Sequence, residues 1–178
     1  MEPFGDLGVE SVRYSKAIAI FHWLTAVLVI IAYVISESSP QIRSDPPTVH
    51  ILLGLSVLTL TAPRLLLRLI GGVPSPLKSV SKRWARLSRV GHAALYLLLF
   101  LVPLTGWFTV SRLGLKIELL GMDLPLLIRP VAGNPGPIAD VHQIGGNILF
   151  CIALLHAGFA FWHCFRLRDQ TLQRMWPF

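Results

Sequence analysis

Four apolar stretches, each about as long as a bilayer is thick, divide the amino-acid sequence. A helix needs about 20 mainly apolar residues to cross the hydrocarbon, and soluble domains rarely contain such runs. The stretches extend from Ala17 to Ile35, Val49 to Leu67, Val90 to Val110 and Ile144 to Phe165. They predict an all-α fold, an integral membrane four-helix bundle that forms one domain over residues 1–178, with helices at about 17–36, 48–70, 90–112 and 138–166.

The positive charges are concentrated at particular ends of these helices. The formal net charge is +7, which by itself also suits a nucleic-acid binder, but basic residues that flank spanning helices fit membrane orientation better. They precede the first helix, surround the second connection and follow the fourth helix: Arg13, Lys16, Arg64, Arg68, Lys78, Lys82, Arg83, Arg86, Arg89, Arg166, Arg168 and Arg174. By the positive-inside rule, we expect both termini in the cytoplasm and a multi-pass membrane protein, in contact with lipid and not with nucleic acid.

The other two connections carry mixed charges and should face the periplasm. Their cations are Arg43, Arg112, Lys116 and Arg129, and their acids are Glu37, Asp45, Glu118, Asp123 and Asp140. The long connection before the fourth helix is rich in proline and glycine, which predicts an irregular loop. We expect one short helix in it, around Leu113 to Leu120.

Four histidines lie inside or at the edges of the apolar stretches, where ionisable side chains are costly and usually mark a functional site. The alternating directions of the helices place His50 and His142 near the periplasmic face. His22 lies in the cytoplasmic half, and His156 follows His142 by 14 residues, about 21 Å along one helix face. Equal depth therefore pairs His50 with His142 and His22 with His156.

Two bis-histidine pairs in an apolar bundle fit two haems. Iron in a porphyrin has two axial positions, and neutral imidazoles from opposed helices can fill both. The sequence has two cysteines and no Cys-x-x-Cys-His motif, which argues against covalent c-type attachment. The expected cofactors are two haem b groups, with His22, His50, His142 and His156 as the iron ligands. A zinc site of Asp140, His142 and His50 is an alternative, but it leaves the other pair unexplained.

Four further residues each have more than one interpretation. His163 follows His156 by two helical turns and either competes with it as a ligand, bonds a quinone carbonyl, or is an interfacial histidine without a role. His92 has the same ambiguity. Arg64 and Arg68 are one turn apart, and they either bind a haem propionate or a quinone head group, or anchor the helix at the membrane surface.

Several motifs together resemble the bacterial cytochrome b561 family, which is related to the cytochrome b subunits of membrane hydrogenases. The similarity runs from Arg13 to Pro177. The motifs are Phe21-His22-Trp23-Leu24, Val49-His50-Ile51, Arg64 to Arg68, Gly91-His92 with Pro103, Leu155-His156-Ala157 with His163, and the segment from Asp169 to Met175. Each motif is weak alone, and the combination is specific.

The resemblance implies two b haems on the same histidine pairs and a ubiquinone site on the cytoplasmic side near His163. The family includes a superoxide oxidase, which passes electrons from periplasmic superoxide through both haems to quinone. Superoxide:ubiquinone oxidoreductase is accordingly the expected activity. An alternative is the electron-transfer and anchor subunit of a quinone-linked dehydrogenase or hydrogenase complex, with another periplasmic electron donor; a haem-free transporter is a third class, which the four histidines disfavour.

Overall fold

Four long helices form the protein in the computed structural model, which describes residues 14–37, 48–71, 82–119, 121–131, 134–168 and 171–177. They are α1 (Lys16–Glu37), α2 (Thr48–Gly71), α3 (Lys82–Leu113) and α4 (Pro137–Trp162). A short π-helix, η1 (His163–Leu167), continues α4, and a 3-10 turn, η2 (Gln173–Met175), follows near the C-terminus. All four long helices are apolar enough to cross a membrane.

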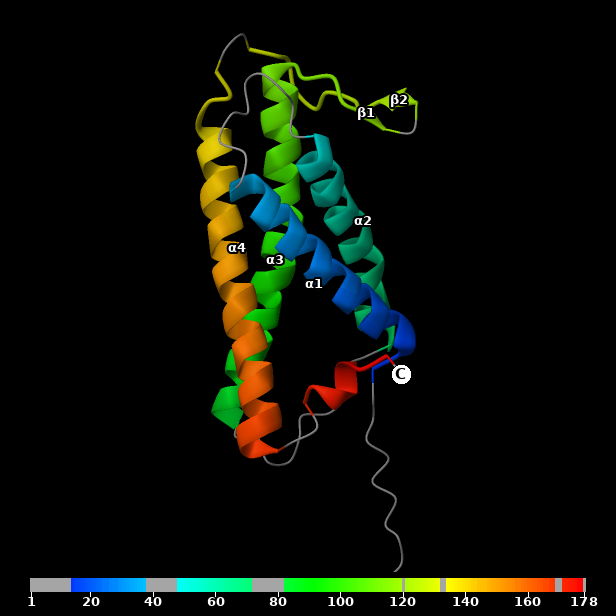
Figure 1. Ribbon diagram of the computed structural model, residues 1–178, viewed down its shortest axis with the longest axis vertical. Coiled ribbons are helices and arrows are strands. Elements are labelled where there is room, and N and C mark those ends of the chain that lie inside the picture. Colours follow the sequence, from blue (N-terminus) through cyan, green and yellow to red (C-terminus); the bar gives the residue numbers. More distant parts are fainter. Residues whose placement is uncertain are drawn as a thin grey trace, which may run out of the picture.

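The helices alternate in direction, and α1 crosses diagonally over the other helices (Figure 1). The helix pairs α1 with α2, α3 with α4 and α2 with α3 pack most closely, whereas α1 touches α4 at few places. One of these contacts is a stack of Tyr33 on Phe150, with ring centres 3.9 Å apart. The fold is thus an all-α four-helix bundle with sequential neighbours, as the apolar stretches predict.

The outer surface of the bundle is apolar along its length. Large hydrophobic side chains such as Ile30, Leu97, Leu154 and Phe161 are exposed, while the two buried clusters are small. A soluble protein rarely exposes so much continuous apolar surface to water. In a membrane, lipid chains cover such a surface and keep it from water. The exposed side chains therefore face lipid.

The two ends of the bundle differ in charge. We call the end where α1 and α3 begin and α2 and α4 end the basic end; its described cations are Lys16, Arg64, Arg68, Arg83, Arg86, Arg89, Arg166, Arg168 and Arg174. At the opposite end lie the acidic residues that the structure describes, Glu37, Glu118, Asp123 and Asp140. Arg13, Arg43 and Lys78 fall outside the described residues.

A β-hairpin, and not the expected short helix, follows α3. Its strands β1 (Glu118–Leu119) and β2 (Met122–Asp123) pair antiparallel and extend from the top of the bundle beside α2 (Figure 1). Gly114 and Gly121 have φ values of +68° and +80°, a left-handed backbone that ends the helix and turns the hairpin. The prediction of a helix around Leu113 to Leu120 is therefore wrong, and we call this end of the molecule the hairpin end.

The third helix begins at Lys82, eight residues before the predicted start. Its first two turns are rich in basic residues, so an apolar stretch does not reveal them. The fourth helix changes to π geometry at His163, inside the range predicted as one helix. The longer α3 places His92 ten residues, about 15 Å, beyond the helix start.

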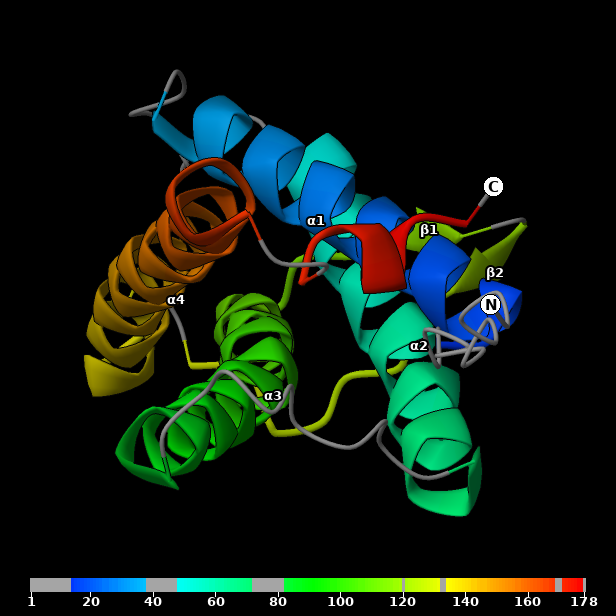
Figure 2. The ribbon, with the colours of Figure 1, turned by 90° about the horizontal axis from the view of Figure 1, so that it is seen from below.

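The C-terminal segment folds back on α1 at the basic end, as the view from below shows (Figure 2). The indole Nε1 of Trp23 donates to the carbonyl oxygen of Met175 at 2.9 Å, and the amide of Tyr14 donates to Arg174 O at 3.2 Å. The residues just before and in α1 and the residues after α4 therefore meet at the basic end of the molecule.

Candidate haem sites

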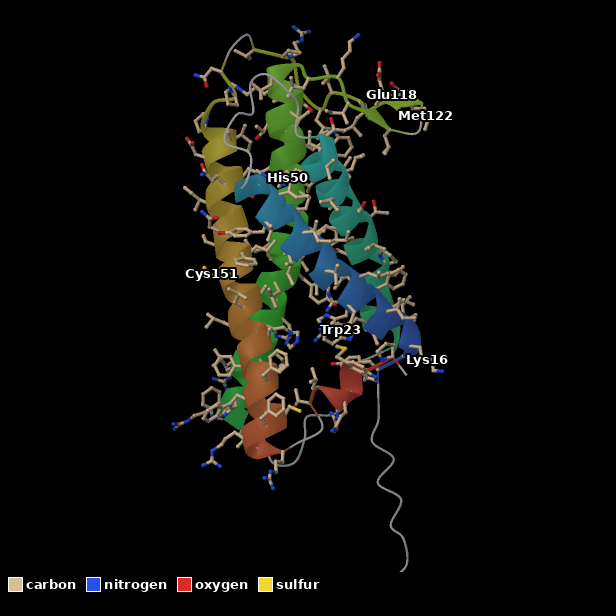
Figure 3. The ribbon with its side chains drawn as sticks, viewed as in Figure 1. Lys16, Trp23, His50, Glu118, Met122 and Cys151 are labelled. Carbon is tan, nitrogen blue, oxygen red and sulfur yellow. The ribbon has the colours of Figure 1, made fainter. Side chains whose placement is uncertain are left out.

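The histidine pair at the hairpin end joins α2 to α4. His50 lies in the upper part of the bundle in Figure 3, and its ring centre is 5.9 Å from that of His142, with the rings at 85°. A metal–imidazole bond is about 2 Å long, so two imidazoles on opposite sides of one metal ion have ring centres about 6 Å apart. The spacing of this pair fits one iron between the two rings.

Backbone carbonyls set the orientation of both of these rings. His50 Nδ1 lies 3.0 Å from Ala32 O on α1, and His142 Nδ1 lies 2.9 Å from Val102 O on α3. A carbonyl only accepts, so each Nδ1 carries the hydrogen and each Nε2 keeps its lone pair. Metal-binding histidines usually show this arrangement. All four helices thus contribute to this site.

A glycine makes room beside the His142 ring. A Cβ at Gly106 would stand 2.8 Å from His142 Cε1, which is closer than real carbon contacts allow. Any side chain at this position would displace the imidazole. Gly54, Gly145 and Gly146, which are close to His50 and His142 in the sequence, have no such contact with a histidine.

The second pair lies toward the basic end and joins α1 to α4. The ring centres of His22 and His156 are 6.3 Å apart, at 81°, which again fits one metal ion between two imidazoles. In Figure 3 the neighbouring Trp23 marks this level, well below His50. The two pairs therefore lie at different depths of the bundle.

The contacts of the second pair differ from those of the first. Arg64 Nη2 lies 2.8 Å from His22 Nδ1. A guanidinium only donates, so His22 Nδ1 accepts and Nε2 carries the hydrogen. Coordination of iron by Nε2 requires the other tautomer, so Arg64 has to release His22 when a haem is held there.

A third imidazole joins this pair. The ring centre of His92 on α3 is 5.1 Å from that of His156, and His92 Nδ1 lies 2.7 Å from Ser88 O. From the sequence alone His92 is ambiguous, because the predicted helix begins only two residues before it, at about residue 90. The structure places His92 ten residues into α3 and so well inside the bundle, which the apolar pattern does not indicate.

His163, by contrast, begins the π-helix at the end of α4. It is about 10 Å further along the helix than His156. The same region has a shallow pocket of about 380 Å³, lined by Gly158, Phe161, Trp162, Phe165 and Arg166. With about 3.6 residues per turn, Gly158, Phe161 and Trp162 lie on the face of α4 opposite His156, so this pocket faces away from the histidines.

Arg68 and Arg64 both lie over the ring of Tyr96 on α3, with their Cζ atoms 5.5 Å and 5.1 Å from its centroid. Arg64 is 7% exposed, so it is not a surface anchor. Near the other pair, no zinc site is formed: within the described part of the chain, no three His, Cys, Asp or Glu residues are grouped to hold a metal ion. The zinc alternative with Asp140 has no support.

Comparison with known proteins finds similarity over nearly the whole chain. The family model described as prokaryotic cytochrome b561 matches residues 13–178. Cytochrome b561 homolog 2 of Escherichia coli K12 is 28% identical over 170 residues, which cover 92% of this chain and 90% of the relative.

Two further relatives show the range of names among similar proteins. The probable superoxide oxidase CybB of Yersinia pestis is 28% identical over 173 residues, covering 93% of this chain and 96% of that protein. Cytochrome b562 of Cereibacter sphaeroides is 28% identical over 176 residues, covering 91% and 94%. The chain belongs to the prokaryotic cytochrome b561 family, whose members are b-type haem proteins of the membrane that transfer electrons.

Proposed function

We propose that this protein is a dihaem cytochrome b of the bacterial inner membrane that transfers electrons from periplasmic superoxide to ubiquinone. The observation that carries the proposal is the presence of two histidine pairs at different depths of one spanning bundle, with ring centres 5.9 Å and 6.3 Å apart. A haem b bound by each pair would supply reversible one-electron iron chemistry. His50 and His142 would hold one haem, and His22 and His156 the other.

The side chains around these pairs orient the ligands and exclude water. Ala32 O and Val102 O hold the rings of His50 and His142 in the tautomer that leaves Nε2 free. Apolar residues such as Val57, Leu99 and Leu149 fill the bundle between the two levels. Six-coordinate ligation by two histidines favours electron transfer over binding of oxygen.

The overall reaction balances with no acid or base at the hairpin end. Two superoxide anions each lose one electron and become dioxygen. One ubiquinone takes up the two electrons and two protons and becomes the quinol. We place the quinone at the basic end, which the positive-inside rule assigns to the cytoplasm, with His163 as the residue that bonds a quinone carbonyl.

The charges at the hairpin end leave a second function open. Superoxide is attracted by positive charge, and Arg112 on α3 is half-buried there, with an Nε atom that has no hydrogen-bond partner among the described residues. Exposed carboxylates of Glu118, Asp123 and Asp140 lie at the same end. This mixed surface also suits docking of a periplasmic electron-donor protein, as in a dehydrogenase or hydrogenase complex.

Rapid mixing of the purified, oxidised protein with superoxide separates the two functions. We expect fast growth of the reduced haem absorption bands, followed by quinol formation when ubiquinone is supplied. If added quinol reduces both haems but superoxide reduces neither, the protein is instead the cytochrome subunit of a larger complex. Co-purification of a periplasmic subunit would support that outcome.

A further inference from the structure

The guanidinium group of Arg64 is buried inside the spanning part of the bundle. Arg64 is 7% exposed and lies seven residues, about 10 Å, before the end of α2. A long basic side chain near a helix end usually extends to the membrane surface, but Nη2 of Arg64 points to His22 at 2.8 Å. An ionisable group held at this depth is costly unless it has a partner.

Arg68 is a second cation beside Arg64, and no carboxylate of the described residues lies with them. Arg68 shares the ring of Tyr96 with Arg64, and Tyr14 is within electrostatic range of Arg64, Arg68 and Arg174. Every acidic residue in the described ranges belongs to the hairpin end. Among the described residues no carboxylate balances the charge of this cluster, so a bound anion would be stabilised there.

Two buried hydrogen-bond donors in the cluster are unused. Arg64 Nε and the hydroxyl of Tyr96 have no hydrogen-bond partner in the part of the chain that the structure describes, and Tyr96 is 9% exposed. Buried polar groups are nearly always hydrogen-bonded. Guanidinium groups with free donors bind carboxylates and phosphates through paired hydrogen bonds, so the chemistry of the missing partner is that of a small oxyanion.

We propose that Arg64, Arg68 and Tyr96 bind a propionate carboxylate of the haem that His22 and His156 hold. This inference rests on the proposed function, because it requires that haem. The contact of Arg64 with His22 places the oxyanion site directly beside that pair. A phospholipid phosphate has the same chemistry, but it lies in the head-group region and not about 10 Å inside a helix end. Binding of the propionate also gives Arg64 a partner other than His22 Nδ1, as coordination by Nε2 requires.

Redox titration of the purified holoprotein gives the first test. Loss of a cation beside a haem favours the oxidised, more positive state, so Arg64→Met should lower the potential of one haem and leave the other unchanged. We expect at least a tenfold fall in the ratio of reduced to oxidised haem at fixed potential, which is about 59 mV for a one-electron couple. Arg83→Met, an exposed residue at the same end, is the control and should change neither potential.

Infrared difference spectra identify the anion. In reduced-minus-oxidised spectra of protein that contains haem with ¹³C-labelled propionates, the isotope-sensitive carboxylate bands should shift in Arg64→Met and, to a smaller extent, in Tyr96→Phe. Arg64→Lys keeps the charge but loses the paired donors, so it should shift the bands with little change in potential. This variant keeps the test usable where Arg64→Met does not fold.

The outcomes are distinct from failure of the proposed function. A protein without haem contradicts that function, whereas a dihaem protein with unchanged propionate bands and potentials in Arg64→Met contradicts only this inference. If the Arg64 effect disappears after exchange of the wild type and the variant into a phosphate-free detergent, the anion is a lipid phosphate and the inference is also wrong.

Discussion

Gly106 on α3 lies against the imidazole of His142 on α4: a Cβ added to Gly106 would stand 2.8 Å from His142 Cε1. Gly106→Ala should therefore displace the ring, weaken its bond to Val102 O and reduce occupancy of the haem site at the hairpin end. Gly146→Ala is the matched control, because no atom lies within 4 Å of its added Cβ. Haem quantification of both variants measures the difference. Equal haem content in the two would show that the site tolerates the methyl group.

Single replacement of each histidine should sort the six into groups. His22→Ala and His156→Ala should each lose about one haem equivalent, with the same spectral component missing, because both rings serve one site. His50→Ala and His142→Ala should lose the other component. Reduced-minus-oxidised spectra with haem quantification make the assignment.

Two histidines serve as controls in that series. His163→Ala should retain both haems, because His163 lies about 10 Å beyond His156 along the helix. His92→Ala should retain both haems but perturb the spectrum of the His22 and His156 site, since its ring centre is 5.1 Å from that of His156. Loss of a haem in His163→Ala would reassign the ligand.

The helices and the pairing of the histidines could be predicted from the sequence because both depend on local pattern. Apolar length gives the spans, and alternating direction gives the depth of each residue. The rings of His50 and His142, and of His22 and His156, do lie near each other, whereas their role as iron ligands stays a prediction.

The features that could not be predicted depend on packing between helices. Nothing in the sequence pattern shows that Gly106 faces His142, or that Ala32 O and Val102 O hold the ligand rings. The burial of Arg64 was also unpredictable, because a basic residue near the end of an apolar stretch is usually a surface anchor. The early start of α3 was missed since Lys82 to Arg89 is polar.

The phenol of Tyr14, just before α1, should make stability sensitive to alkaline pH. Burial raises its pKa above the ordinary value, although Arg68 opposes the shift. The neutral phenol is therefore favoured in the folded state. Its contribution is fully present below the unfolded pKa of about 10 and is lost as the pH rises through the folded value. Thermal melting followed by circular dichroism should show a smaller alkaline loss for Tyr14→Phe than for the wild type; parallel pH profiles would contradict this.

Trp23 should hold the C-terminal segment on the bundle. Its indole donates to Met175 O, and its ring packs edge-on against Trp176 at 6.0 Å. Trp23→Phe removes the hydrogen bond, which is worth about 1 kcal/mol, so local opening of residues 171–177 should become about fivefold more frequent. Amide exchange of this segment measures the change. Trp107→Phe, which removes the corresponding bond to Pro125 O at the hairpin end, should leave the segment unaffected.

The two ends of the bundle predict the orientation in the membrane. The start of α1 and the C-terminal segment share the basic end, where Tyr14 N donates to Arg174 O at 3.2 Å, and basic ends stay in the cytoplasm. A fluorescent protein fused to the C-terminus should therefore fluoresce, and alkaline phosphatase fused there should be inactive. Alkaline phosphatase inserted after Gly121, in the turn between β1 and β2, should be active, since the hairpin end faces the periplasm. The reverse pattern of activities would place the superoxide-accessible site in the cytoplasm and contradict the proposed direction of electron transfer.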